Sequence, residues 1–284
     1  MSRKNWTSEK IFNRLLQNKT QKTYWNNISE LRRRPNQEVF EKAYLLAKSD
    51  IDKQKIIGLH VLQQLGFNPR YNKKQTIELH FDLLEKAQTN NILRSIFHGI
   101  GHNNEELTDK QISKLLEFKN IKTESLKHAL ISALSGIENM NAIEALIHFS
   151  EDKSSSIRNW ATFGIGSLIE LDNTEIRNAL WNRVRDHDFD TKSEAIVGLA
   201  NRKDKRVKQI IMNELENESY GTLLLEAIVT INDQDFLPLL DRKLEIAKQS
   251  KEDIKNGWVL ALSETINELK KTSISLVKTK HVKG

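Results

Sequence analysis

A small residue recurs about every 32 positions inside apolar, helix-patterned segments, from the middle of the chain to its end. The spacings between successive copies are 34, 31, 34, 32 and 31 residues. A fixed period of roughly 20–50 residues is typical of stacked repeats, in which each unit buries its apolar face only against its neighbours. The period therefore predicts an elongated stack of repeated units. The recurring positions are Gly99, Ala133, Gly164, Gly198, Thr230 and Ala261.

Each repeat has the pattern of a helical hairpin. In the clearest copy, a first helix over 139–148 is followed by a polar turn, in which Ser154, Ser155 and Ser156 are candidate N-caps. Apolar residues at intervals of three and four then mark a second helix over 157–169. In the next copy Asp188 or Asp190 is the expected cap. No segment alternates with period two over a useful length, so the chain is predicted to be all-α.

The same pattern extends over most of the chain, although its earlier copies are less regular. We expect about seven or eight hairpins in a single solenoid over residues 1–271, with 1–34 as a divergent N-terminal cap and 35–271 as repeats. Residues 272–284 are expected to form a basic C-terminal tail. Besides the copies above, the predicted hairpins pair 37–48 with 52–65, 77–87 with 92–101, 109–118 with 125–137, and 235–247 with 252–271.

Composition narrows the setting in which such a stack works. Hydrophobic residues make up 38% and charged residues 29% of the 284 positions, which suits a protein with much exposed helix surface. No apolar run reaches the roughly 18 residues that a membrane helix needs, and residues 1–17 are too polar for a signal peptide. The absence of cysteine excludes disulfides and thiolate metal sites. We therefore expect a cytoplasmic protein with no membrane partner.

The net charge of +6 is concentrated at the two ends. Residues 1–50 carry a net +6 and residues 268–284 a net +4, which leaves a net charge of −4 on residues 51–267. Basic ends on a mildly acidic body argue against a nucleic-acid groove along the whole solenoid, but they leave the ends as candidates. The most basic local segment is KTQKTYWNNISELRRR at 19–34, where Tyr24 and Trp25 lie among the cations. Such a mixture is typical of single-strand binding, although the rings would also cover the end of a core.

The segment 154–240 resembles the bacterial HEAT-repeat proteins of the short-repeat type found in phycobilisome lyases. The resemblance is carried by SIRNWATFGIGSL, EAIVGLANRKD and LLLEAIVTIND, and it is strongest over residues 120–265. It implies a right-handed, armadillo-type α-solenoid, with first helices on the convex side and second helices lining the concave side. Family members are mostly binding scaffolds, and a few relatives attach bilins or excise alkylated bases. No catalytic motif is shared by the family.

The second helices carry the candidate partner-binding residues. Trp160, Glu194 and Glu226 stand four positions before the small site and are expected near the concave surface. An aromatic ring beside two carboxylates would bind a basic segment of a protein through cation–π and ionic contacts, or simply be a packed Trp beside solvated acids. Arg158 and Lys192 begin their helices at a common register. They would either contact a partner or form an internal ladder with nearby carboxylates.

Other candidate sites have structural interpretations that we favour. His98 and His102 have the i, i+4 spacing of a metal pair, but no glutamate follows His98, so core packing is expected. The run 186–190 imitates the start of a calcium loop and then lacks its glycine and its bidentate glutamate, which favours a turn and a helix cap. Nothing in the sequence separates the pKa values of Glu194 and Glu226 for acid–base catalysis.

These observations predict a non-enzymatic scaffold that binds a protein or peptide on its concave face through Trp160, Glu194, Glu226, Arg158 and Lys192, without a cofactor or a metal. Two alternatives stay open. One is a nucleic-acid-binding protein that uses the basic ends, related to the HEAT-like alkylpurine DNA glycosylases. The other is a lyase for a bilin or another prosthetic group.

Overall fold

The computed structural model describes the backbone of residues 3–87, 89–217 and 221–280, and the side chains as far as residue 271. Every regular element within these ranges is helical, which confirms the predicted all-α fold class. The chain forms two compact units, Met1–Ala145 and Leu146–Gly284. The single array predicted over 1–271 stays a prediction. No helix in the described ranges combines the length and the apolar character needed to cross a membrane.

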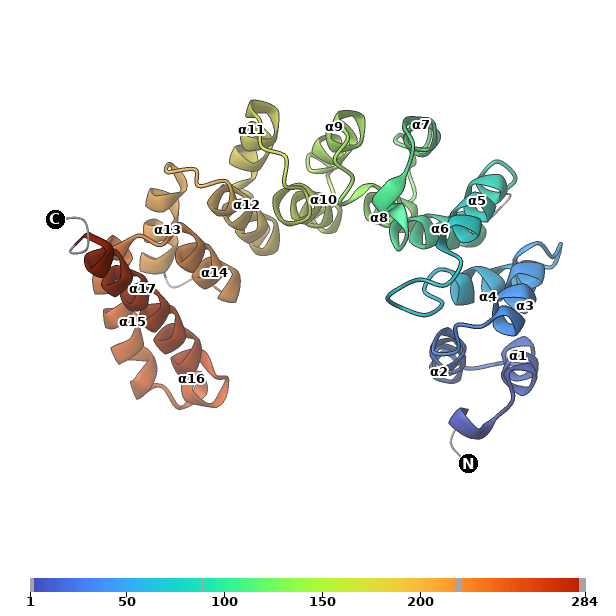
Figure 1. Ribbon diagram of the computed structural model, residues 1–284. Helices are drawn as coiled ribbons and strands as arrows, with labels where there is room; N and C mark the ends of the chain where they lie inside the picture. The colour runs from blue at the N-terminus through green and yellow to red at the C-terminus, as the bar shows by residue number, and fades with distance from the viewer. Residues whose placement is uncertain (1–2, 88, 218–220, 281–284) are drawn as a thin grey trace. The chain divides into compact units, whose positions relative to one another are not determined.

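The first unit is a series of antiparallel hairpins (Figure 1). Its second helices pack in sequence, α2 against α4, α4 against α6 and α6 against α8, so that they form one layer. The predicted cap over 1–34 contains the hairpin α1–α2, preceded by a short 3-10 turn, η1 (Arg3–Asn5). The helices are α1 (Ser8–Leu16), α2 (Gln21–Arg32), α3 (Gln37–Ala47), α4 (Asp52–Leu62), α5 (Lys73–Leu84), α6 (Asn90–Gly101), α7 (Asp109–Leu116) and α8 (Glu124–Leu134).

The second unit repeats this arrangement after α9 (Met140–Phe149), the helix within which the division between the units falls. Here α10, α12, α14 and α17 pack in sequence and form the layer that we call the second-helix face. The helices are α10 (Ser155–Ser167), α11 (Thr174–Arg183), α12 (Phe189–Asn201), α13 (Val207–Glu216), α14 (Thr222–Ile231), α15 (Leu237–Gln249), α16 (Lys251–Lys255) and α17 (Trp258–Lys280).

Local sequence explains where many of these helices begin. Asn36, Thr89 and Asn173 each accept a hydrogen bond from the third residue of the helix they precede, which satisfies one of the free amide groups of its first turn. Thr108 forms a complete capping box with Gln111. Asp188, one of the two predicted caps of α12, accepts from the amide of Thr191 at 2.9 Å.

Two glycines lie at a close approach between second helices of the second unit. A Cβ at Gly198 of α12 would lie 2.6 Å from the Cα of Gly166 in α10, and 3.0 Å from the side chain of Leu180. The recurring small residue at Gly198 therefore lies at a close contact between consecutive second helices. Its partner, however, is Gly166 rather than Gly164, which is also buried in α10.

Gly198→Ala is expected to lower the free energy of unfolding of the second unit by about 1–2 kcal/mol. Overpacking costs about 1–3 kcal/mol, and the better helix propensity of alanine, about 1 kcal/mol, offsets only part of it. Urea unfolding followed by circular dichroism measures the change, with the exposed Asn182→Ala on α11 as control. Equal stability of Gly198→Ala and the wild type would show that α10 and α12 are not packed backbone to backbone.

Gly99 has a different reason for being small. A Cβ there would lie 2.0 Å from Nε2 of His80, whose ring is completely buried between α5 and α6. The ring donates from Nδ1 to the carbonyl oxygen of Thr76 at 2.6 Å. Gly99 therefore accommodates the imidazole of its own hairpin.

The C-terminal hairpin departs from its prediction in two ways. The helix expected over 252–271 is broken at Gly257, which has φ +76° and separates α16 from α17. This left-handed conformation suits glycine because a Cβ would strain it. In addition, α17 continues to Lys280, so the predicted tail from residue 272 is helical to that point. Residues 281–284 lie outside the described part of the chain.

Candidate functional site

An acidic groove lies between α14 and α17 on the second-helix face. It has a volume of about 450 Å³, and carboxylates from both helices line it: Glu226 from α14, and Glu264 and Glu268 from α17. No Lys or Arg is among its described lining residues. Thr230 and Ala261, two of the recurring small positions, also line the groove, so at this end of the array the small residues leave space between the helices.

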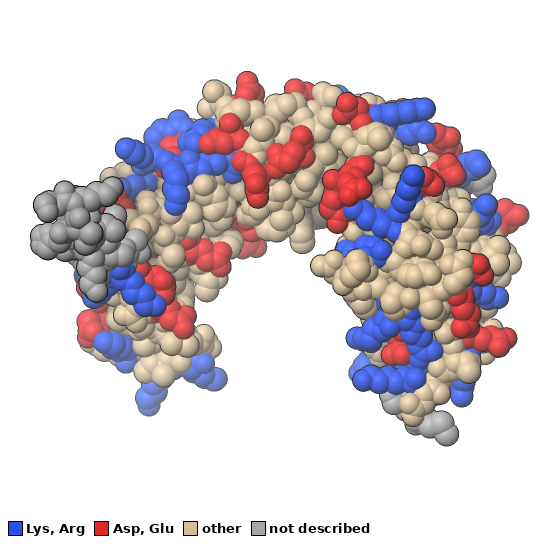
Figure 2. Space-filling model, viewed as in Figure 1, with Lys and Arg blue, Asp and Glu red and all other residues tan. Residues whose placement is uncertain are grey.

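Glu194 extends this acidic surface onto α12. Burial raises its pKa, and the charges of Glu226 and Asp190 act in the same direction, while a hydrogen bond from Ser167 at 3.4 Å lowers it. Because the charge of Glu226 on α14 raises the pKa of Glu194 on α12, the two predicted carboxylates lie near each other on these packed helices. Figure 2 shows Asp and Glu side chains over this part of the second unit.

Exposed apolar side chains accompany the carboxylates. Trp160 of α10 is 54% exposed, and its ring packs edge-on against Phe163 with the ring centroids 5.9 Å apart. Phe189 and Val229 are exposed at 39% and 38%, on α12 and α14. Trp160 occupies the register on α10 that Glu194 occupies on α12, as the repeat predicts. The second-helix face thus combines uncovered apolar groups with negative charge.

The two predicted cations, by contrast, are engaged inside the protein. Arg158 makes a two-pronged ion pair with Asp186, at 2.9 Å from Nε and 2.8 Å from Nη2. Lys192 pairs with Glu214 of α13 at 2.5 Å and lies over the ring of Phe189. These contacts match the internal ladder that we considered as the alternative. We therefore leave Arg158 and Lys192 out of the candidate partner surface.

The suggested metal motifs have structural partners of their own. Asp186 binds Arg158 and Arg183, and Asp188 caps α12, so the calcium-like run is a turn and a cap. The two glutamates that follow His102 face Lys73, with Glu105 at 2.9 Å. No group of three or more metal-ligand side chains occurs within the described residues.

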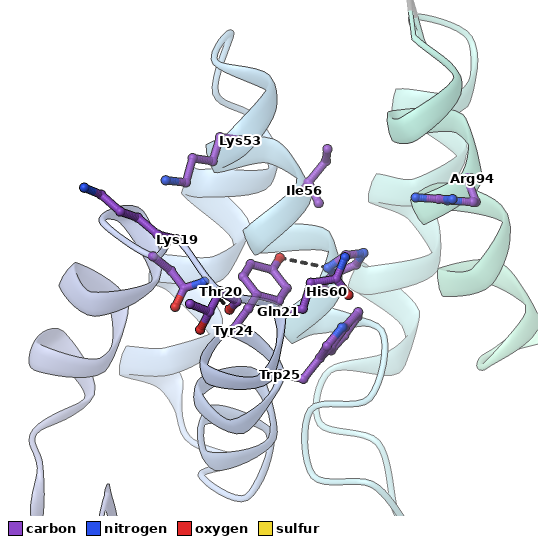
Figure 3. Close-up of a pocket in the computed structure, with 10 residues that line it drawn as sticks. Lys19, Thr20, Gln21, Tyr24, Trp25, Lys53, Ile56, His60 and Arg94 are labelled. Atoms are coloured by element: carbon purple, nitrogen blue, oxygen red, sulfur yellow. Dashed lines mark hydrogen bonds between the residues drawn. The ribbon is translucent and has the colours of Figure 1, made fainter.

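The first unit contains a pocket of opposite charge, about 700 Å³ in volume (Figure 3). Tyr24 and Trp25, singled out in the sequence, lie at its base, and cations surround them. Lys19 comes from the α1–α2 connection, Lys53 from α4 and Arg94 from α6. Its described lining residues include no Asp or Glu. Figure 2 also shows Lys and Arg side chains gathered over the α2 end of this unit.

His60 of α4 fixes the aromatic rings of this pocket. Its ring stacks on Trp25, with the centroids 4.9 Å apart, while Tyr24 approaches both rings edge-on. The Tyr24 hydroxyl lies 2.8 Å from Nδ1 and the Ser95 hydroxyl 3.2 Å from Nε2. Because Ser95 donates its proton to the carbonyl oxygen of Asn91, its oxygen accepts from Nε2–H, and Nδ1 accepts from Tyr24.

This network keeps His60 neutral. Burial, followed by the positive charge of Arg32, lowers the pKa of His60 to about 3. Arg32 is itself buried, and it donates to the backbone oxygen of His60 at 2.6 and 2.9 Å and to Oε1 of Gln64 at 2.6 Å. Sequence reasoning missed His60, Lys53 and Arg94, which join this site from other hairpins. The basic-aromatic segment 19–34 was the only local signal for it.

Comparison with known proteins supports the fold. No family model matches the chain. Protein YibA of Escherichia coli K12 is 33% identical over 123 residues, which covers 43% of this chain and 44% of YibA, and YibA of Escherichia coli O157:H7 gives the same values. The match thus spans less than half the length of these curated relatives.

A solved structure extends the likeness to nearly the whole chain. The X-ray structure of Escherichia coli YibA matches with a TM-score of 0.66 at 22% sequence identity, over 94% of this chain and 93% of that one. The chain shares the fold of YibA. Together with the stacked hairpins of each unit, this establishes an all-α, solenoid-type architecture.

Proposed function

We propose that this chain is a non-enzymatic, cytoplasmic scaffold of HEAT-like repeats, whose second-helix face binds a basic segment of a partner protein. The groove between α14 and α17 carries the proposal. It offers the carboxylates of Glu226 and Glu264 between apolar walls that include Leu225 and Val229, while Glu268 at its edge pairs with Lys271 at 2.7 Å. Lysine and arginine side chains match such a groove, because their stems bury against apolar surface while their charged heads reach the acids.

The electrostatics of the face favour the same class of partner. Neither Glu226 nor Glu264 has an ion-pair partner among the described residues, so their charge is free to act on an approaching cation. Arranged charge of one sign speeds encounter with an oppositely charged partner and fixes its register. Trp160, exposed on α10, would add cation–π and apolar contact at one end of the surface.

A nucleophile–base pair beside the basic pocket has a geometry that supports a non-enzymatic role. Ser95 and His60 lie within hydrogen-bond reach of each other, but Ser95 is 4% exposed and donates to a backbone carbonyl. A histidine whose pKa is about 3 is a weak base near neutral pH. The arrangement therefore supports the packing of α2, α4 and α6. Lyase and glycosylase activity remain predictions of the family resemblance.

A pull-down from the native host tests the proposal. The tagged wild type is compared with the Glu194→Lys, Glu226→Lys double variant, and captured proteins are quantified by mass spectrometry. We expect recovery of basic partners to fall at least tenfold, because each like-charge contact at an interface costs about 1.4 kcal/mol or more.

A matched charge reversal on the other helix layer serves as control. Glu175 of α11 and Glu216 of α13 are exposed, and Glu175→Lys with Glu216→Lys changes the net charge by the same amount. This variant should retain the wild-type partners. An identical set of partners from all three proteins would refute the assignment of this face.

A further inference from the structure

The basic pocket of the first unit is a second candidate site, independent of the acidic face. Three cations converge on it from separate elements: Lys19, Lys53 and Arg94, each with an exposed side chain. The nearest contacts of Lys53 and Arg94 are neutral oxygens, the carbonyl of Leu16 at 2.5 Å and the side chain of Asn91 at 3.4 Å. Their charges are therefore not neutralised by these contacts and act on the pocket.

Two further groups strengthen the positive potential. The guanidinium of buried Arg32 lies over the Trp25 ring, 6.0 Å from its centroid, and both groups that it hydrogen-bonds are neutral. The N-terminus of α2 also opens on the pocket, since Thr20 and Gln21 line it and the side chain of Thr20 makes no capping hydrogen bond. The free amides of a first helical turn favour an anion.

An aromatic platform lies among these charges. Trp25 is 43% exposed although it stacks on His60, so part of its ring system faces the pocket in a fixed orientation (Figure 3). Simple covering of a core does not require cations from three elements around an open ring. A planar aromatic group stacked on such a platform is stabilised by about 1–3 kcal/mol.

We propose that this pocket binds a nucleotide unit, with its base against Trp25 and its phosphate among Lys19, Lys53 and Arg94. The volume of about 700 Å³ lies within the range of roughly 300–1,000 Å³ of small-ligand pockets. The unit is supplied either as a free nucleotide or as one position of a single strand. Both sources present the same base and phosphate.

Titration of the full chain at low salt with four probes tests the proposal. The probes are AMP, adenosine, inorganic phosphate and a fluorescein-labelled oligo(A) strand. Binding is measured by calorimetry and, for the labelled strand, by fluorescence anisotropy. AMP should bind at least tenfold more tightly than adenosine or phosphate, because only AMP engages both halves of the site. If oligo(A) binds with an affinity similar to that of AMP, the ligand is a free nucleotide. If the strand binds much more tightly than AMP, the ligand is a single-stranded nucleic acid.

Variants assign the binding to the pocket. Trp25→Ala should weaken nucleotide binding about tenfold or more, and Lys53→Gln with Arg94→Gln should do the same and flatten the salt dependence. Because the side chains of Lys53 and Arg94 are exposed, the variant with Lys53→Gln and Arg94→Gln should keep the wild-type melting temperature even if Trp25→Ala does not. Lys74→Gln, an exposed charge on α5, is the matched control. The proposal would be overturned if AMP and oligo(A) both bound with dissociation constants above about 1 mM, which is the scale of a very weak ligand. An equal loss of binding in Lys74→Gln would also overturn it.

Discussion

Arg202→Ala is expected to lower the free energy of unfolding of the second unit by about 3–5 kcal/mol, which is the scale for removing a charge that satisfies buried partners. Arg202 of the α12 C-terminus is only 8% exposed. Its guanidinium donates to five backbone carbonyl oxygens at 2.8–3.1 Å: those of Gly198, Ile165, Gly166, Ile169 and Leu171.

The size of this effect follows from where the carbonyls lie. Four of the five belong to the last turn of α10 or to the chain directly after it, where helical carbonyls have no partner within the helix. A cation at a helix C-terminus is also favoured by the helix dipole. Arg202 therefore caps the second helix of the preceding repeat, and alanine would remove the donor that these carbonyl oxygens share.

Urea unfolding of the variants measures the loss. Arg202→Lys should recover only part of the stability, because one ammonium group cannot reach the carbonyls that a planar guanidinium spans. The exposed Arg185→Ala should change stability by less than about 0.5 kcal/mol. A loss below about 1 kcal/mol for Arg202→Ala would show that water replaces the guanidinium, and that the capping is not structural.

Buried His60 and His80 together are expected to cost the first unit about 4 kcal/mol of stability between pH 7 and pH 5, and His102, whose pKa burial also lowers to about 4, adds to this loss. Burial holds the pKa of His60 at about 3 and that of His80 at about 4, whereas an unfolded chain has histidine pKa values near 6.5. Below pH 6.5 the unfolded chain binds protons that the folded unit does not, so stability falls as the pH falls toward 4. At pH 5 the cost is about 2 kcal/mol for each histidine.

Comparison of the two units provides the control for this prediction. His187 of the second unit is exposed, and the carboxyl of Asp204, whose pKa Arg206 and other neighbours hold at about 2, stays ionised at pH 5. Urea unfolding at pH 7 and pH 5, monitored by hydrogen exchange in α6 and in α12, should therefore show a selective loss of stability in the first unit. A loss of equal size in both units would contradict the assignment to His60 and His80.

Much of the fold could be predicted because its determinants are local. The helices follow apolar residues at intervals of three and four, and caps such as Asp188 lie directly before them. The interactions that decide the packing are not local. Gly99 faces His80, 19 positions earlier, and Gly198 faces Gly166 instead of Gly164. Periodicity identifies a small residue, but not the group that approaches it.

The same limit applies to the sites. Glu194 and Glu226 could be placed together because the repeat puts equal registers on adjacent helices. The groove they adjoin depends on Glu264 and Glu268, which lie beyond the glycine break that the sequence pattern did not reveal. At the basic pocket Tyr24 contacts His60, 36 positions later, and His60 contacts Ser95, a further 35 positions along the chain, so no window of sequence contains the site.

Site-specific photo-crosslinking tests the central claim most directly. A benzoylphenylalanine at Val229, beside the acidic groove, is compared with one at the exposed Gln209 on α13, and cells of the native host are irradiated. We predict an adduct with a basic protein from position 229 that is absent from position 209 and disappears when Glu226→Lys is added. Equal adducts from both positions, or an adduct that survives Glu226→Lys, would contradict the proposal that this acidic face binds the partner.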